Sequence, residues 1–165
     1  MSTFKKIMVA LGITQYAEGI FAYAAGLAEA LEADLLVVNI INKRDVEAIR
    51  SITSMGYEVD GGHYVEGVRA DRSAFLKEII ERAGFPPERI RTIIKVGNPY
   101  EKLLEIIVQE KVDMVVMGSK SRMDFEHMLV GSVASKIFRR SPVTVVSYRS
   151  EAEAEHLRRH IRRDG

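Results

Sequence analysis

Five short apolar segments divide the chain, and longer polar or amphipathic stretches separate them. They cover residues 7–11, 35–41, 90–96, 112–117 and 143–148. Each segment is apolar nearly throughout and rich in Val, Ile or Met, whereas a strand with one solvent-facing side would alternate. This pattern is typical of strands buried on both faces, as in a parallel sheet. The chain is therefore predicted to contain five such strands.

The stretches between these segments show helical periodicity. Within residues 15–32, the apolar positions that share one helical face are Ala17, Ile20, Phe21, Ala24, Leu27, Ala28 and Leu31. A second helix is predicted after Asn98, which is expected to cap it. Pro99 would take the first helical position, and Glu101 would complete an approximate capping box. A shorter helix is expected after Gly131.

Two further helices are predicted between the second and third strands, over residues 44–54 and 63–83. Strands that alternate with helices in this way predict right-handed crossovers and a doubly wound α/β sheet with helices on both faces. Such sheets bind ligands at the carboxyl ends of their strands, near the point where the strand order reverses. The loops of interest are therefore those that follow Leu11, Ile41, Val96 and Met117.

The chain is predicted to form one domain over residues 1–149, followed by a charged tail over residues 150–165. The tail is interpreted as a surface helix or a contact for a partner. His156 and His160 have the spacing of paired metal ligands on a helix. Their charged surroundings favour a solvated helix face instead.

Composition narrows the functional classes. A length of 165 residues suits a single domain. The absence of cysteine excludes disulfides, thiolate metal sites and cysteine nucleophiles, and it fits a reducing compartment. A net charge of +1 gives no bias toward nucleic acid or a membrane surface, and no apolar run approaches the roughly twenty residues of a membrane span. A cytoplasmic protein without nucleic-acid or membrane partners is expected.

The loop after the fourth apolar segment has the chemistry of an anion site. Its small and polar residues are Gly118, Ser119, Lys120, Ser121 and Arg122, and then Gly131, Ser132 and Val133. Glycine lets the backbone approach a ligand closely, and free N–H groups at a helix start attract phosphate. Alternatively, Gly118 and Gly131 serve tight turns and Ser132 caps the helix. Spacing alone leaves both interpretations open.

Other nucleotide and signalling folds fit less well. The chain lacks both the GxxxxGK[ST] and the GxGxxG patterns, which argues against a Walker-type NTPase and a Rossmann dehydrogenase. A response-regulator receiver would need acidic residues at the end of its first strand. Leu11 and Gly12 stand there instead.

Several segments resemble the universal stress protein family. They include the run Val-Gly-Asn-Pro at 96–99, the strand and loop at 112–119, Gly-Ser-Val-Ala-Ser-Lys at 131–136, and Ser-Pro-Val-Thr-Val-Val at 141–146. The first strand, followed by a long Ala-rich helix, also fits, so that the resemblance covers nearly all of residues 4–148. It implies a five-stranded sheet of the adenine-nucleotide-hydrolase-like arrangement and usually a homodimer.

The resemblance also implies a site for ATP or AMP, with Mg²⁺ as a candidate companion of the phosphates. Family members that bind ATP carry Gly, two residues, Gly, nine residues, Gly and then Ser or Thr. Carried onto this chain, the implied binding residues are Ala10, Leu11, Gly12, Thr14, Ile40, Met117, Gly118, Ser119, Ser121, Arg122, Gly131, Ser132 and Val133.

Two residues depart from the pattern of the ATP binders. Ser121 replaces the second glycine of the loop, and its Cβ restricts the backbone there. Gly12 stands where ATP binders usually place an aspartate that contacts the nucleoside. The main chain around Asn39 and Ile40 remains available for recognition of adenine.

The resemblance and its two departures leave three candidate functions. The first is a nucleotide-binding regulatory module whose occupancy alters its contacts with an unidentified protein partner. The second is a nucleotide-free homodimeric interaction protein of the same fold, suggested by Gly12 and Ser121. The third is a weak Mg²⁺-dependent ATPase in which Asp124 or Glu126 organises the cation. No water-activating base is evident, so efficient hydrolysis is not predicted.

A homodimer is expected to form along the last strand, from Val143 to Tyr148. An unpaired strand edge presents free backbone groups and invites pairing with a second copy.

Overall fold

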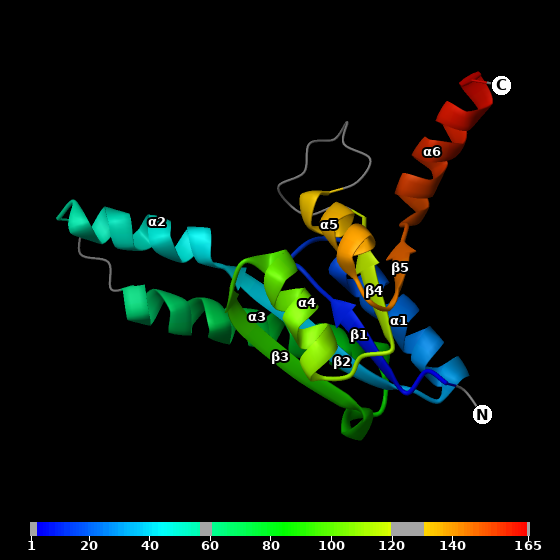
Figure 1. Cartoon of the computed structure of the whole chain (residues 1–165), viewed down its shortest axis with the longest axis horizontal. Coiled ribbons are helices and arrows are strands. Elements are labelled where there is room, and N and C mark those ends of the chain that lie inside the picture. The colour runs from blue at the N-terminus through cyan, green and yellow to red at the C-terminus, as the bar shows by residue number, and fades with distance from the viewer. Residues whose placement is uncertain (1–2, 57–60, 120–130, 165) are drawn as a thin grey trace.

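A five-stranded parallel sheet forms the centre of the computed structural model, which describes residues 3–56, 61–119 and 131–164 (Figure 1). The strand order is β3-β2-β1-β4-β5. The strands are β1 (Lys6–Ala10), β2 (Asp34–Asn42), β3 (Ile90–Gly97), β4 (Met114–Gly118) and β5 (Thr144–Tyr148). The predicted doubly wound α/β fold is confirmed, and each strand lies within two residues of its predicted bounds.

Helices cover both faces of the sheet, which explains the unbroken apolar character of the strands. Ile7 and Val9 of β1 contribute to the core beneath α1 (Ala17–Leu31) and α3 (Gly61–Ala83). Met8, on the opposite side of the same strand, belongs to the core beneath α4 (Pro99–Gln109) and α5 (Ser132–Arg140). Because successive strand residues point to opposite faces, burial on both sides requires apolar residues at every position.

The strands do not end at the same level. Ala10, the last residue of β1, pairs with Val38 and Met117, and β4 ends one residue later. β2 and β3 continue together as far as the pair Asn42 and Gly97. The β2–β3 pair therefore projects beyond β1 at the carboxyl edge of the sheet, and no described strand pairs with the β1-facing side of residues 39–42.

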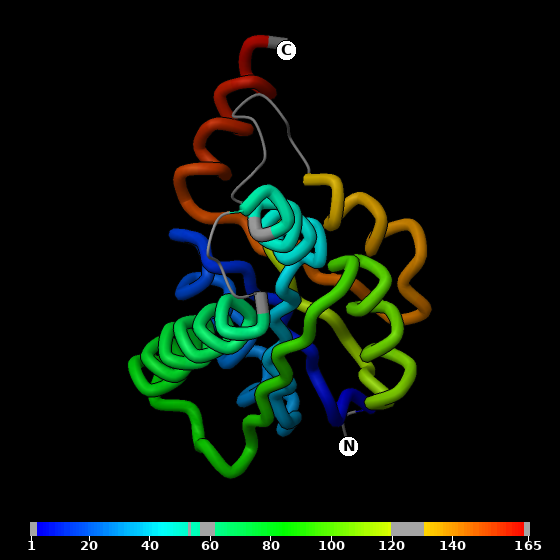
Figure 2. Tube along the Cα trace, turned by 90° about the vertical axis from the view of Figure 1, so that its left-hand side faces the viewer, coloured from blue at the N-terminus to red at the C-terminus, as the bar shows by residue number. Residues whose placement is uncertain are grey.

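A helix pair extends from this projecting part of the sheet. α2 (Lys43–Ser54) follows β2 directly and lies beside the first half of α3 (Figures 1 and 2). Both helices occur where the sequence predicts them, although α3 begins two residues earlier than expected, at Gly61.

The predicted capping box of α4 is wrong. Asn98 occupies the N-cap position and Pro99 the first turn, as expected, but the Asn98 side chain makes no capping hydrogen bond. Its buried Oδ1 atom has no partner in the described part of the chain. The Glu101 carboxylate instead accepts a hydrogen bond from the Tyr100 hydroxyl, at 3.3 Å, and does not reach back to the N-cap.

The tail forms α6 (Glu151–Asp164), which begins directly after β5 and projects away from the sheet (Figures 1 and 2). Leu157 is half-buried, whereas Ile161 is 72% exposed. None of the described helices has the length and apolarity that a membrane crossing requires.

Candidate functional site

The reversal of strand order brings the ends of β1 and β4 side by side at the carboxyl edge of the sheet. β1 and β4 are neighbours, with Ala10 paired to Met117 at their ends. The chain leaving β1 continues through α1 to β2 on one side, and β5 lies on the other side of β4. Connections that diverge in this way leave a crevice between them, which is where open α/β sheets bind ligands.

The segment after β1 combines a fixed backbone with open space. The Leu11 N–H donates to the Val38 carbonyl at 3.0 Å, and the Leu11 side chain is buried in the core. The Thr14 hydroxyl accepts the Tyr16 N–H at 3.1 Å and so shapes the entry into α1. Gly12 is exposed, and a Cβ atom there would lie 3.4 Å from Thr14 Cγ2, an ordinary contact. A side chain at position 12 is therefore sterically possible.

The start of α5 lies beside the end of β4. The Gly131 N–H donates to the Ser119 carbonyl at 2.6 Å, which holds the start of α5 beside the end of β4. Gly131 is the N-cap of α5, and no described side chain caps the helix. The alternative in which Ser132 caps α5 is therefore wrong, because Ser132 is the first helical residue. The N–H groups of the first turn lack intrahelical acceptors and lie at the positive end of the helix dipole.

The structure thus brings together many of the residues predicted from sequence, but not all with the same role. The side chains of Leu11 and Met117 are buried in the two cores, so only their main chains can face a ligand. Gly118 is half-buried, Ser119 is 1% exposed, and Ser132 is exposed.

The predicted residues outside the described part of the chain are Lys120, Ser121, Arg122, Asp124 and Glu126. The Mg²⁺-dependent ATPase that depends on the last two stays a prediction.

A polar cluster that the sequence analysis missed lies on the projecting end of β2. Asn39 is 1% exposed, and its amide nitrogen donates to the Leu11 carbonyl at 2.6 Å. Arg72 of α3 donates from Nη1 to Asn39 Oδ1 at 2.8 Å and to the Ile40 carbonyl at 3.0 Å. The main-chain acceptor proposed for adenine is therefore already bound by an arginine.

Burial dominates the electrostatics of this cluster. Desolvation lowers the pKa of the Arg72 guanidinium, while the nearby Asp45 and Tyr64 act in the opposite direction.

The sequence contains a signal that could have identified Arg72 as part of this cluster. Leu76 and Ile79, four and seven residues further on, are buried, so Arg72 shares the sheet-facing stripe of α3. A charged residue on such a stripe must find a polar partner at the edge of the sheet.

Comparison with known proteins decides the family. A model of the Universal stress protein family matches residues 3–149. The chain belongs to this family. A relative that bears the same family name, SH1215 of Staphylococcus haemolyticus, is 29% identical over 165 residues, which cover 98% of this chain and 94% of the relative.

Solved structures agree on the fold of this universal stress protein. The hypothetical protein MJ0577 superposes with a TM-score of 0.73 at 20% identity, covering 90% of this chain and 98% of that one. A universal stress protein in complex with cAMP gives 0.63 at 21% identity, with 89% and 98% coverage. A universal stress protein from Archaeoglobus fulgidus in complex with dAMP gives 0.59 at 16% identity, with 88% and 98% coverage.

The C-terminal helix of this universal stress protein touches the segment after β4. Ser150 and Glu153 form a reciprocal capping box. Glu153 Oε2 accepts the Ser150 N–H at 2.8 Å, and the Ser150 hydroxyl accepts the Glu153 N–H at 3.2 Å. The Ser119 hydroxyl donates to Glu153 Oε1 at 3.4 Å. The Ser-x-x-Glu motif at 150–153 is a sequence signal for this helix start.

A recess of about 270 Å³ lies at the opposite, amino-terminal edge of the sheet, lined by the starts of β2 and β3. Its two arginines and Asp34 form ion pairs with one another or with a near neighbour. Arg89 lies 3.4 Å from Asp34, and Arg91 lies 2.5 Å from Glu110. Because both arginines are already paired and the recess lies away from the strand-order reversal, we place no ligand there.

Proposed function

We propose that this universal stress protein binds an adenine nucleotide, ATP or AMP, at the carboxyl edge between β1 and β4. The observation that carries the proposal is the uncapped start of α5, which the Gly131–Ser119 hydrogen bond holds beside the end of β4. Two structural neighbours are complexes with cAMP and dAMP, which supports an adenine nucleotide as the ligand class.

The two ends of the site suit the two ends of a nucleotide. The main-chain N–H groups at Ser132 and Val133 would donate to phosphate oxygens, which the helix dipole also favours. The main chain at Gly12 would meet the nucleoside, beside Leu11 and Ile40, whose carbonyls already accept hydrogen bonds from Asn39 and Arg72. ATP would bring Mg²⁺ bound to its own phosphates, because this cation keeps phosphate and water ligands. Occupancy would then alter contacts with a regulatory protein partner.

The test is calorimetric titration of nucleotide-stripped protein with Mg-ATP and with AMP. Ser132 is exposed at the first position of α5, so a substitution there spares the core. Ser132→Asp should stabilise the helix start yet weaken ATP binding about tenfold by repulsion of phosphate. Ser132→Asn, of the same shape without the charge, should change the affinity less than about threefold.

The outcomes separate the two leading functions. Micromolar binding that Ser132→Asp weakens and Ser132→Asn spares supports the nucleotide-binding module. Absence of heat with millimolar ATP and AMP, from protein that circular dichroism shows to be folded, overturns it.

The second candidate is a nucleotide-free interaction protein. Two contacts favour it besides the residues Gly12 and Ser121: Arg72 binds the Ile40 carbonyl, and Glu153 contacts Ser119. Both positions are ones that a nucleotide would use. If this candidate is correct, the natural protein shows no affinity for nucleotide, and its role rests on protein contacts alone.

We further propose that two copies pair along β5. This strand lies at the edge of the sheet and pairs only with β4 among the described strands. Its residues are half-buried or exposed, so its outer backbone edge is accessible to a second copy. Light scattering at micromolar concentration should give twice the monomer mass, and Val146→Pro, which distorts the strand edge, should give the monomer mass. A monomer mass for the natural protein contradicts the proposal.

A further inference from the structure

The sheet register brings the start of α6 to the candidate phosphate end of the site. Tyr148, the last residue of β5, pairs with Gly118, the last residue of β4. The chain leaving β5 therefore emerges beside the chain leaving β4. α6 begins three residues later, and its first turn places the Glu153 carboxylate against Ser119.

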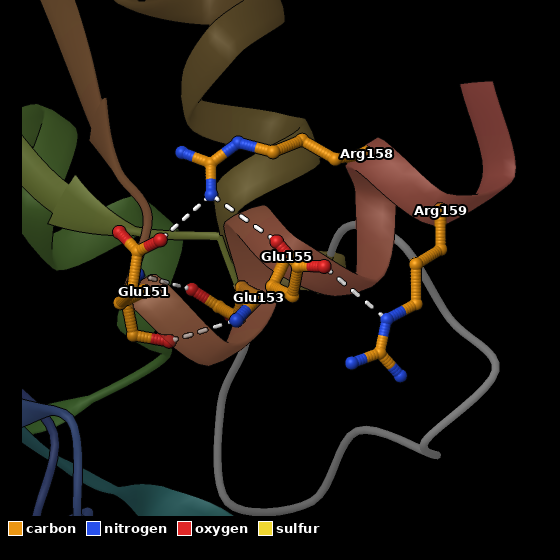
Figure 3. A network of polar contacts seen from close by, with 6 residues as sticks. Glu151, Glu153, Glu155, Arg158 and Arg159 are labelled. Atoms are coloured by element: carbon orange, nitrogen blue, oxygen red, sulfur yellow. Dashed lines mark hydrogen bonds and ion pairs between the residues drawn. The ribbon is translucent and has the colours of Figure 1, made fainter. Parts of the chain in front are cut away.

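Glu153 differs from the other acidic residues of α6 in how its charge is balanced. Glu151 pairs with Arg158 at 2.6 Å, and Glu155 pairs with both Arg158 and Arg159, at 3.5 and 3.3 Å (Figure 3). Within the described residues, Glu153 has no cationic partner, and its carboxylate accepts only from the Ser150 N–H and the Ser119 hydroxyl. Among the described residues its negative charge is therefore uncompensated where it meets Ser119.

The contact with Ser119 is one that a phosphate group can replace. The oxygen–oxygen distance of 3.4 Å is long for a hydrogen bond from a hydroxyl, for which about 2.7 Å is usual. Ser119 is 1% exposed, and Glu153 is the acceptor that the described residues provide for its hydroxyl. A phosphate oxygen offers a stronger acceptor but carries the same sign of charge as Glu153.

We propose that Glu153 is a specificity-determining residue of the nucleotide site. Its negative charge disfavours nucleotides that carry several phosphates. A bound phosphate in turn displaces Glu153 together with the first turn of α6. The proposal rests on the proposed nucleotide binding. Adenosine, which has no phosphate, does not compete with Glu153. AMP competes partly and ATP most strongly. By linkage, an anchored α6 weakens ATP binding to the same degree as ATP weakens the anchoring of α6.

The chain offers a matched pair of variants. Glu153→Gln removes the charge but keeps an oxygen that accepts the Ser150 N–H, because glutamine also serves in capping boxes. Glu155→Gln removes one charge from the same helix at a residue that pairs with arginines and has no contact with Ser119. Both variants therefore change the net charge equally and leave the core untouched.

The experiment titrates the full chain and both variants with adenosine, AMP and ATP at one ionic strength. Glu153→Gln should raise the affinity for ATP about tenfold and that for AMP less, and should leave adenosine unchanged. Glu155→Gln should leave all three affinities within about twofold. An unchanged ratio of ATP to adenosine affinity in Glu153→Gln, or an equal gain in Glu155→Gln, overturns the proposal.

Amide hydrogen exchange reports the displacement independently. The Ala154 N–H donates to the Ser150 carbonyl at 2.9 Å in the first turn of α6. Saturating ATP should accelerate exchange in this turn, and saturating adenosine should not. Unchanged exchange with ATP overturns the displacement. Failure of every ligand to bind every variant overturns the proposed function, whereas intact binding without a charge effect overturns only the role of Glu153.

Discussion

Arg72 donates a hydrogen bond to the amide oxygen of Asn39 across 2.8 Å, although the two residues lie 33 positions apart in the chain. The same guanidinium group reaches the Ile40 carbonyl, and Asn39 in turn donates to the Leu11 carbonyl. A single chain of hydrogen bonds thus joins α3, the projecting end of β2 and the loop after β1. It holds the β1 side of the candidate site in place.

Loss of Arg72 should therefore destabilise the fold. Arg72→Ala leaves the buried Asn39 amide oxygen without its donor, which should lower the free energy of unfolding by about 2 kcal/mol. Arg69 is a matched control, because it also donates to a strand carbonyl, that of Ile94 at 2.6 Å, but is exposed. Arg69→Ala should cost less than about 0.5 kcal/mol, since water can replace it. Urea unfolding measures both, and equal losses contradict the assignment.

Two glycines of α1 should respond differently to replacement by alanine. At Gly26 a Cβ atom meets nothing within 4 Å, so Gly26→Ala should stabilise the helix by roughly 0.5–1 kcal/mol. At Gly19 it would lie 2.8 Å from the hydroxyl oxygen of Tyr148, whose ring packs against Tyr23 with centroids 5.6 Å apart. Gly19→Ala should therefore not give the increase in stability that is expected for Gly26→Ala. Thermal unfolding compares the two, and a similar rise in Tm for both contradicts the close contact.

Restoration of the family pattern at Gly12 and Ser121 should test whether these two residues limit nucleotide binding. The backbone at Gly12 accepts a Cβ atom at ordinary contact distance, so Gly12→Asp should change the free energy of unfolding by less than about 0.5 kcal/mol. Combined with Ser121→Gly, it should increase the affinity for Mg-ATP in calorimetry. If the natural protein shows no binding and the double variant binds, the nucleotide-free candidate gains support. No increase at all means that neither residue limits binding.

The domain boundary predicted at residue 149 can be tested by truncation. Neither apolar core includes a residue of α6, and the family match also ends at residue 149. A chain ending at Arg149 should therefore fold, with a Tm lower by roughly 2–4 °C for each kcal/mol of lost α6 packing. Circular dichroism and thermal unfolding are the measurements. A truncated chain without cooperative unfolding would place α6 within the folding unit.

The sequence predicted the elements because their patterns are local. Burial on both sheet faces makes every position of a strand such as β2 apolar, and this is visible without knowledge of its neighbours. The same holds for the apolar stripe of α1 and for the resemblance that the family match confirmed. The capping box at Asn98 failed because a three-residue spacing does not determine where the side chain of Glu101 turns.

The tertiary structure alone decided the contacts that shape the candidate site. The projection of β2 beyond β1 depends on where two strands end relative to each other, and the sequence of either strand does not contain that offset. Arg72 meets Asn39, and Glu153 meets Ser119, across separations of 33 and 34 residues. Periodicity indicates which face of an element is buried, but only the packed sheet determines which polar groups meet at its edge.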